Sequence, residues 1–63
     1  MPGLFVGEKV KVYEDPITCQ KLEGEVTVKQ IKRVEINDAL AVCDVVFKGE
    51  EEIRERVINI DHK

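Results

Sequence analysis

Apolar and polar residues alternate over residues 9–13 and again over 22–28, and this feature most constrains the fold of the 63-residue chain. Successive side chains of a β-strand point to opposite faces of its sheet, so this period is typical of strands that bury one face. We expect Val10 and Val12 to point into a core. An Asp-Pro pair at 15–16 supplies a turn signal between the two segments. The chain is therefore predicted to begin with two strands joined by a loop.

The second strand is predicted to cover about residues 22–32 and to bend. Val26 and Val28 share one phase of the alternation, whereas Ile31 lies in the opposite phase. A change of phase within one strand indicates a β-bulge, which bends the strand and increases its twist. Gly24 has no side chain and permits close approach of another segment. This strand is therefore expected to curl the sheet.

Residues 39–47 are the most apolar segment, so we predict a central third strand there. A turn is expected at residues 37–38 before it, and residues 48–49 close it. A hairpin then leads to a strand at 51–56, and residues 57–60 are predicted to form a last short strand.

The end of the chain admits a second interpretation. Ile53, Val57 and Ile60 are spaced at i, i+4 and i+7, and His62 ends the segment, as in an amphipathic helix. Alternation of strand type is less regular here, because it places Glu55 in phase with Ile53 and Val57. We predict strand and a short turn for residues 50–62, with a terminal helix as the alternative.

Two shorter segments complete the predicted core. Leu4, Phe5 and Val6 are expected to cover one of its ends. The connection over residues 14–21 is too long for a tight hairpin, and Ile17 is expected to fold back from it as a plug.

Length and composition predict a single domain over residues 1–63 with a small aliphatic core. The net charge is −3, with a balance of +1 over residues 1–33 and −4 over residues 34–63. General attraction to nucleic acid is not supported by this total, although a local basic patch remains open. No apolar run reaches the length of a membrane span and no secretory signal is evident, so we expect a cytoplasmic protein without membrane contact.

The two cysteines are too few and too far apart to indicate a disulfide framework or a zinc site. Cys43 lies in the apolar third strand and is expected to be buried in the core, whereas Cys19 lies in a predicted loop. A single bridge between the two stays open as the alternative.

Catalysis is not expected. His62 is the only histidine, and no motif of a nucleophile, a phosphate-binding loop or a metal site is present. Glu50, Glu51 and Glu52 are consecutive, and successive strand residues point to opposite faces, so they cannot converge on a metal. We predict no enzyme activity, no cofactor, no metal and no small-molecule substrate.

Two candidate interaction surfaces follow from the predicted strands. A protein-binding surface would use the outer face of the third strand or the charged final hairpin, with the residues Val42, Asp44, Val46, Glu51, Arg54 and Arg56. A nucleic-acid-binding surface would use basic side chains of the first two strands, with the residues Lys9, Lys11, Tyr13, Lys29, Lys32 and Arg33. The same lysines can instead be a solvated face that discourages edge-to-edge pairing.

The pattern resembles the small SH3-like barrels, in particular their KOW and Tudor-like branches. The resemblance rests on Gly7 before an alternating strand, the long first loop, the Glu-Gly-Glu-Val sequence at 23–26 and the turn over residues 46–50. It implies an all-β barrel of about five antiparallel strands, here with a possible short C-terminal helical turn. It also implies an interaction module. A Tudor-type aromatic cage is not expected, because only Tyr13 and Phe47 are candidates for it.

The chain is therefore predicted to be a non-catalytic interaction module, either a protein-binding adaptor or a small regulatory subunit. A protein partner or self-association is expected. The alternative is a KOW-like accessory factor that binds nucleic acid through the basic face.

Overall fold

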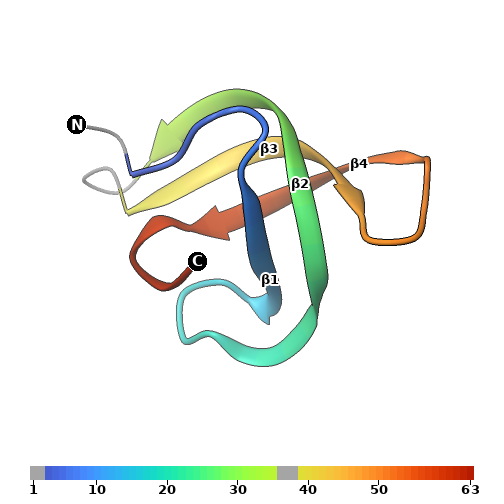
Figure 1. Cartoon of the computed structure of the whole chain (residues 1–63). Coiled ribbons are helices and arrows are strands. Elements are labelled where there is room, and N and C mark those ends of the chain that lie inside the picture. Colours follow the sequence, from blue (N-terminus) through green and yellow to red (C-terminus); the bar gives the residue numbers. More distant parts are fainter. Residues whose placement is uncertain (1–2, 36–38) are drawn as a thin grey trace.

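The computed structural model describes residues 3–35 and 39–63, which form a small antiparallel β-sheet domain (Figure 1). Its elements are β1 (Lys9–Asp15), β2 (Gln20–Glu35), β3 (Leu40–Phe47), β4 (Ile53–Asn59) and a short 3-10 turn, η1 (Ile60–His62). The strands are hydrogen-bonded in the order β1-β2-β3-β4, so β3 is a central strand as predicted. The all-β prediction and the helical turn at the C-terminus are confirmed, and the domain is compatible with an SH3-like fold. The turn predicted at residues 37–38 lies outside the described residues.

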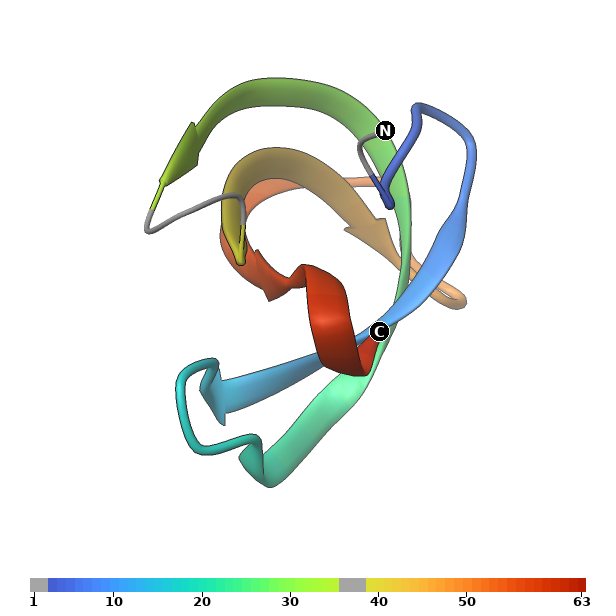
Figure 2. The same cartoon turned by 90° about the vertical axis from the view of Figure 1, so that its left-hand side faces the viewer.

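Over the described residues the sheet contains four strands, one fewer than the five or so predicted, and it is not closed into a barrel. Residues 57–60, predicted as a separate strand, are the end of β4 and the first residue of η1. The helical alternative for residues 50–62 is wrong, because Ile53–Asn59 pairs with β3 along its whole length. Within residues 3–35 and 39–63, no backbone hydrogen bond joins β1 to β4. Figure 2 shows the sheet curled around an open side.

The core lies on the inner face of this curled sheet, and every strand contributes to it. Its buried members are Leu4, Val10, Val12, Val26, Val28, Ala41, Cys43, Val45 and Ile58. The predicted inward positions of Val10, Val12 and Cys43 are confirmed. Small β-branched side chains dominate because they pack well on a pleated surface.

Of the three residues expected to cover one end of the core, only Leu4 does so. Phe5 and Val6 are exposed, so their prediction was wrong. Both belong to a turn in which the Glu8 N–H donates to the Phe5 carbonyl and Gly7 adopts a left-handed backbone with φ of 95°. The turn reverses the chain before β1 and directs their side chains away from the core.

Two bulges in β2 produce the predicted bend. Its pairing with β3 shifts between Val28 and Gln30 and again between Ile31 and Arg33. Each shift inserts one extra residue into β2, Lys29 in the first case and Lys32 in the second. The insertion lets Ile31 pack against the core although it is out of phase with Val28. The phase change read from the sequence is therefore a pair of bulges, which bend β2 between its two partners.

Gly24 lies where β2 passes close to Phe47 at the end of β3. A Cβ atom at this position would lie 3.1 Å from the Phe47 Cδ2 atom and 3.3 Å from Cε2. The close approach that the sequence indicated at Gly24 is thus made by an aromatic ring.

We predict that Gly24→Val lowers the free energy of unfolding by about 1–3 kcal/mol, because the new side chain overlaps the Phe47 ring. Chemical denaturation of the variant measures this. In a Phe47→Leu background the same substitution should cost less, since the smaller side chain leaves room. An equal cost in both backgrounds would show that the ring is not the cause.

The loop between β1 and β2 is shorter than predicted, because the strands continue to Asp15 and from Gln20. The Asp15 carboxylate accepts hydrogen bonds from the N–H groups of Ile17 (3.0 Å) and Thr18 (3.2 Å). Cys19 completes the reversal with a left-handed backbone, φ 57°. The side chain of Ile17 is 69 % exposed, so its predicted role as a plug was wrong. The tight turn points it into solvent.

The ionisation of Asp15 in this turn should make the free energy of unfolding depend on pH. Hydrogen bonds from the Thr18 backbone, the Thr18 side chain and the Ile17 backbone lower the pKa of Asp15. The ionised form therefore stabilises the fold above the pKa of the unfolded carboxyl, about 4, and this contribution is lost as the pH falls through the lower folded value.

Asp15→Ala should consequently destabilise the protein by a constant amount above about pH 5 and by a smaller amount toward pH 2. Thermal unfolding of both proteins across this range is the measurement. A difference that grows on acidification would contradict the assignment.

Candidate protein-binding surface

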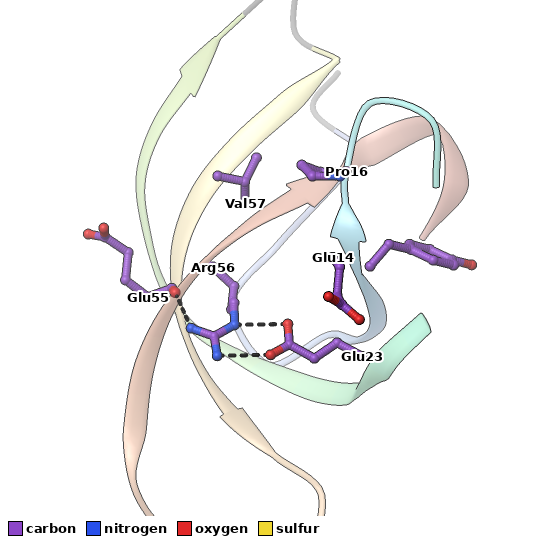
Figure 3. A pocket seen from close by; sticks show the side chains of 7 residues that line it. Glu14, Pro16, Glu23, Glu55, Arg56 and Val57 are labelled. Carbon is purple, nitrogen blue, oxygen red and sulfur yellow. Dashed lines mark hydrogen bonds and ion pairs between the residues drawn. The ribbon is translucent and has the colours of Figure 1, made fainter. Parts of the chain in front are cut away.

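A recess of about 400 Å³ opens at the seam between the two edge strands, β1 and β4 (Figure 3). Its walls come from the end of β1, the loop that follows, the start of β2 and the middle of β4. The lining residues are Tyr13, Glu14, Pro16, Glu23, Glu55, Arg56 and Val57. The recess thus lies where a closed barrel would have paired strands.

Arg56 spans this seam. Its guanidinium donates two hydrogen bonds to the Glu23 carboxylate, at 3.0 and 2.9 Å, and a third to the Glu55 backbone carbonyl at 2.8 Å. It also lies over the Phe47 ring, 5.3 Å from the ring centroid. The hydrogen bond with Glu23 raises the pKa of Arg56. A planar cation with several donors can hold all three groups at once, which a lysine cannot.

Glu23 reaches Arg56 because of a third bulge. The pairing of β1 with β2 shifts between Val12 and Tyr13, whose partners are Gly24 and Leu22. Glu23 is therefore the extra residue. A bulge re-aims its side chain, and here it points across the seam.

A second tie holds the other end of the seam. The Asn59 side-chain amide donates to the Pro16 carbonyl at 2.7 Å, and its oxygen accepts from the Asp61 N–H at 3.0 Å. The same side chain therefore fixes the first loop and caps η1. Side chains rather than backbone ladders join the two edges of this sheet.

The backbone groups of β4 that face the seam can be deduced from the ladder. The Ile60 N–H donates to the Ala39 carbonyl, so these two residues form a hydrogen-bonded pair. Residue pairs of an antiparallel ladder alternate between hydrogen-bonded and non-hydrogen-bonded. The backbone N–H and C=O of Arg56 therefore point toward β3, whereas those of Glu55 and Val57 point toward the free edge. The bond from the Arg56 side chain to the Glu55 carbonyl agrees with this orientation.

The outer face of β3 and β4 carries the first set of predicted residues. Val46 is directly opposite Ile53 in the ladder, and Ile53 is 62 % exposed. Val42 shares this face but is only 7 % exposed, so it offers little contact surface, contrary to expectation. Its neighbours in the ladder are Arg33 and Val57.

Asp44 lies between the two valines and is engaged in a charge cluster. Lys32 forms ion pairs with Asp44 at 3.3 Å and with Glu55 at 2.8 Å. These contacts raise the pKa of Lys32 and lower that of Glu55, the mutual hydrogen bond being the largest cause for each. Lys32, the extra residue of the second bulge, thus bridges two carboxylates of the outer face and leaves this cluster with a net negative charge.

The hairpin between β3 and β4 contains the rest of the predicted protein-binding residues. Arg54 forms ion pairs with Glu50 and Glu52, each at 3.5 Å. Glu51 is exposed between them. Arg54 and Arg56 both pair with core residues of β3 in the ladder and so belong to the inner side of β4.

The predicted basic residues do not form one free patch. Lys32 is bound to two carboxylates, and Arg33 forms an ion pair with Glu35 at 3.5 Å. Lys9 and Lys11 lie on the edge strand β1. Lys29 is exposed at the first bulge, and among the described residues these three lysines form no ion pair. Tyr13 lines the recess at the far end of β1.

Both cysteines are free, with Cys43 buried and Cys19 partly exposed. Burial raises the pKa of the Cys43 thiol, and the nearby Asp44 adds to this effect. Over the described ranges no cluster of three His, Cys, Asp or Glu side chains could hold a metal ion. His62 is exposed on η1, away from the recess lining. Within the same ranges, no helix has the length and apolar character required to cross a membrane.

Comparison with known proteins finds no matching family model, no matching curated protein and no matching solved structure.

The seam suggests a direct test of its side-chain bridge. We predict that Arg56→Lys lowers the free energy of unfolding by about 1–2 kcal/mol, because a lysine loses the paired bonds to Glu23 and the stacking on Phe47. Glu23→Gln should cost less once Arg56 has been replaced. Denaturation of the two single variants and the double variant measures this coupling, and strictly additive costs would show that no bridge exists in solution.

Proposed function

We propose that this chain is an SH3-like, non-catalytic protein-binding module that works in the cytoplasm. The observation that carries the proposal is the apolar pair formed by the half-buried Val46 and the exposed Ile53 beside the free edge of β4. Natural proteins usually protect an edge strand with charges, a proline or a covering segment, because an open edge invites pairing. Here an isoleucine that is 62 % exposed stands on that strand. The two free thiols support a reducing compartment.

Nucleic-acid binding is the weaker alternative. Its support is a set of three lysines, Lys9, Lys11 and Lys29, that form no ion pair with any residue the structure describes. Against it, Lys32 and Arg33 already bind carboxylates of the same chain, and the net charge of −3 opposes phosphate contact.

The chain offers a matched pair of variants for the test. Ile53→Glu introduces a charge into the proposed surface, and Ile17→Glu makes the same change at a similarly exposed isoleucine in the first loop. We expect a protein partner recovered by pull-down and cross-linking to bind about tenfold more weakly to Ile53→Glu and unchanged to Ile17→Glu.

Equal retention by both variants would contradict the proposal. An oligonucleotide that binds at low salt and is released by Lys29→Glu would favour the alternative function instead.

A further inference from the structure

The free edge of β4 passes directly beside the recess, and this combination points to a particular kind of ligand. We infer that β4 binds a basic, extended segment of a partner protein as an additional strand. The inference rests on the proposed function, because β4 is the docking strand in both.

Backbone orientation supports strand addition at this place. The N–H and C=O groups of Glu55 and Val57 face the seam rather than β3, as the alternation of the ladder requires. The Glu55 carbonyl already accepts a hydrogen bond from Arg56. An extended peptide lying along β4 can pair with the Glu55 N–H and with both backbone groups of Val57, and it gains affinity that does not depend on its sequence. The recess of about 400 Å³ provides space beside them.

The charges around the recess select a basic ligand. Three carboxylates line it, those of Glu14, Glu23 and Glu55, against a single guanidinium. Arg56 is already committed to Glu23, and Lys32 is a single cation shared by Glu55 and Asp44. Glu14 forms no ion pair among the described residues. The uncompensated charge is therefore negative, and a cationic segment complements it.

The side chains of β4 further define the order of residues in the ligand. Ile53, Glu55 and Val57 share the outer face of the strand. Directly opposite residues of an added strand contact these side chains. The preferred pattern is therefore apolar, any residue, Lys or Arg, any residue, apolar, with the cation opposite Glu55.

The other edge of the sheet is less suited to the same ligand. β1 presents Lys9 and Lys11, both exposed, and lysines on an edge strand discourage pairing. They also repel a basic peptide. We therefore assign the added strand to β4 rather than to β1.

A synthetic peptide tests the inference directly. The probe is the heptapeptide Thr-Val-Thr-Lys-Thr-Val-Thr, blocked at both ends and labelled with fluorescein. One control has Glu in place of Lys, and another has N-methylvaline in place of both valines, which removes backbone donors that an antiparallel strand turns toward β4. Fluorescence polarisation should show binding of the probe and about tenfold weaker binding of each control. The backbone amide signals of Glu55 and Val57 should shift on titration, and those of Lys9 and Lys11 should not.

Protein variants complete the experiment. Glu14→Lys disturbs no ion pair of the described residues and should weaken the probe about fivefold. Glu55→Lys also releases Lys32 from its ion pair with Glu55, and it should reverse the preference toward the Glu-containing peptide. Glu25→Lys makes the same charge change at an exposed position of β2 outside the recess lining, and it should leave affinity unchanged.

Several results would overturn the inference. Failure of the probe to bind, equal binding of the N-methylated control, or self-association of the protein through β4 in sedimentation would each do so. If a native partner is lost on Ile53→Glu but is insensitive to Glu14→Lys and Glu55→Lys, the inference fails while the proposed function stands. If the native partner is lost equally on Ile53→Glu and Ile17→Glu while the peptide still binds, the proposed function fails separately.

Discussion

One strand must serve both halves of the sheet, and the rest of the structure depends on how β2 does this. β2 is 16 residues long, and it pairs with β1 through its first part and with β3 through its second. A straight strand of this length would place the two pairings in one flat layer with no enclosed core. The extra residues Lys29 and Lys32 bend it while Val28 and Ile31 keep contact with the core. Charged bulge residues suit this purpose because they remain on the solvated side.

The open seam is the consequence of curling only four strands. Their edges approach each other without a backbone ladder, so side chains close the gap. Arg56 reaches from β4 to Glu23, and Asn59 reaches from the end of β4 to the first loop. Paired side chains cost conformational entropy and are partly exposed to solvent, so such a closure is weaker than a continuous sheet. The same arrangement leaves backbone groups of β4 free.

Alternation in the sequence was sufficient to predict which faces of β1 and β3 are buried, as the positions of Val10 and Cys43 show. It also indicated the bend of β2, because Ile31 breaks the phase set by Val28. It could not locate the recess. Glu23 and Arg56 are far apart in the sequence, and their contact depends on a bulge that no residue pattern marks. Ile17 was misplaced because an apolar residue in a tight turn resembles a core residue in composition alone.

The arrangement of charges on β4 links stability to recognition. Arg56 binds the Glu55 carbonyl, so one of the free edge acceptors is already capped, while Lys32 holds the Glu55 carboxylate on the outer face. Such contacts reduce the tendency of an exposed edge to pair without selectivity. They do not cover Ile53, and within the part of the chain that the structure describes no cation pairs with the Glu14 carboxylate. Such an edge resists pairing with acidic and neutral strands more strongly than it resists pairing with a basic strand. The selectivity of β4 for a basic ligand would then arise from carboxylates at its edge that are only partly neutralised, and not from a deep pocket.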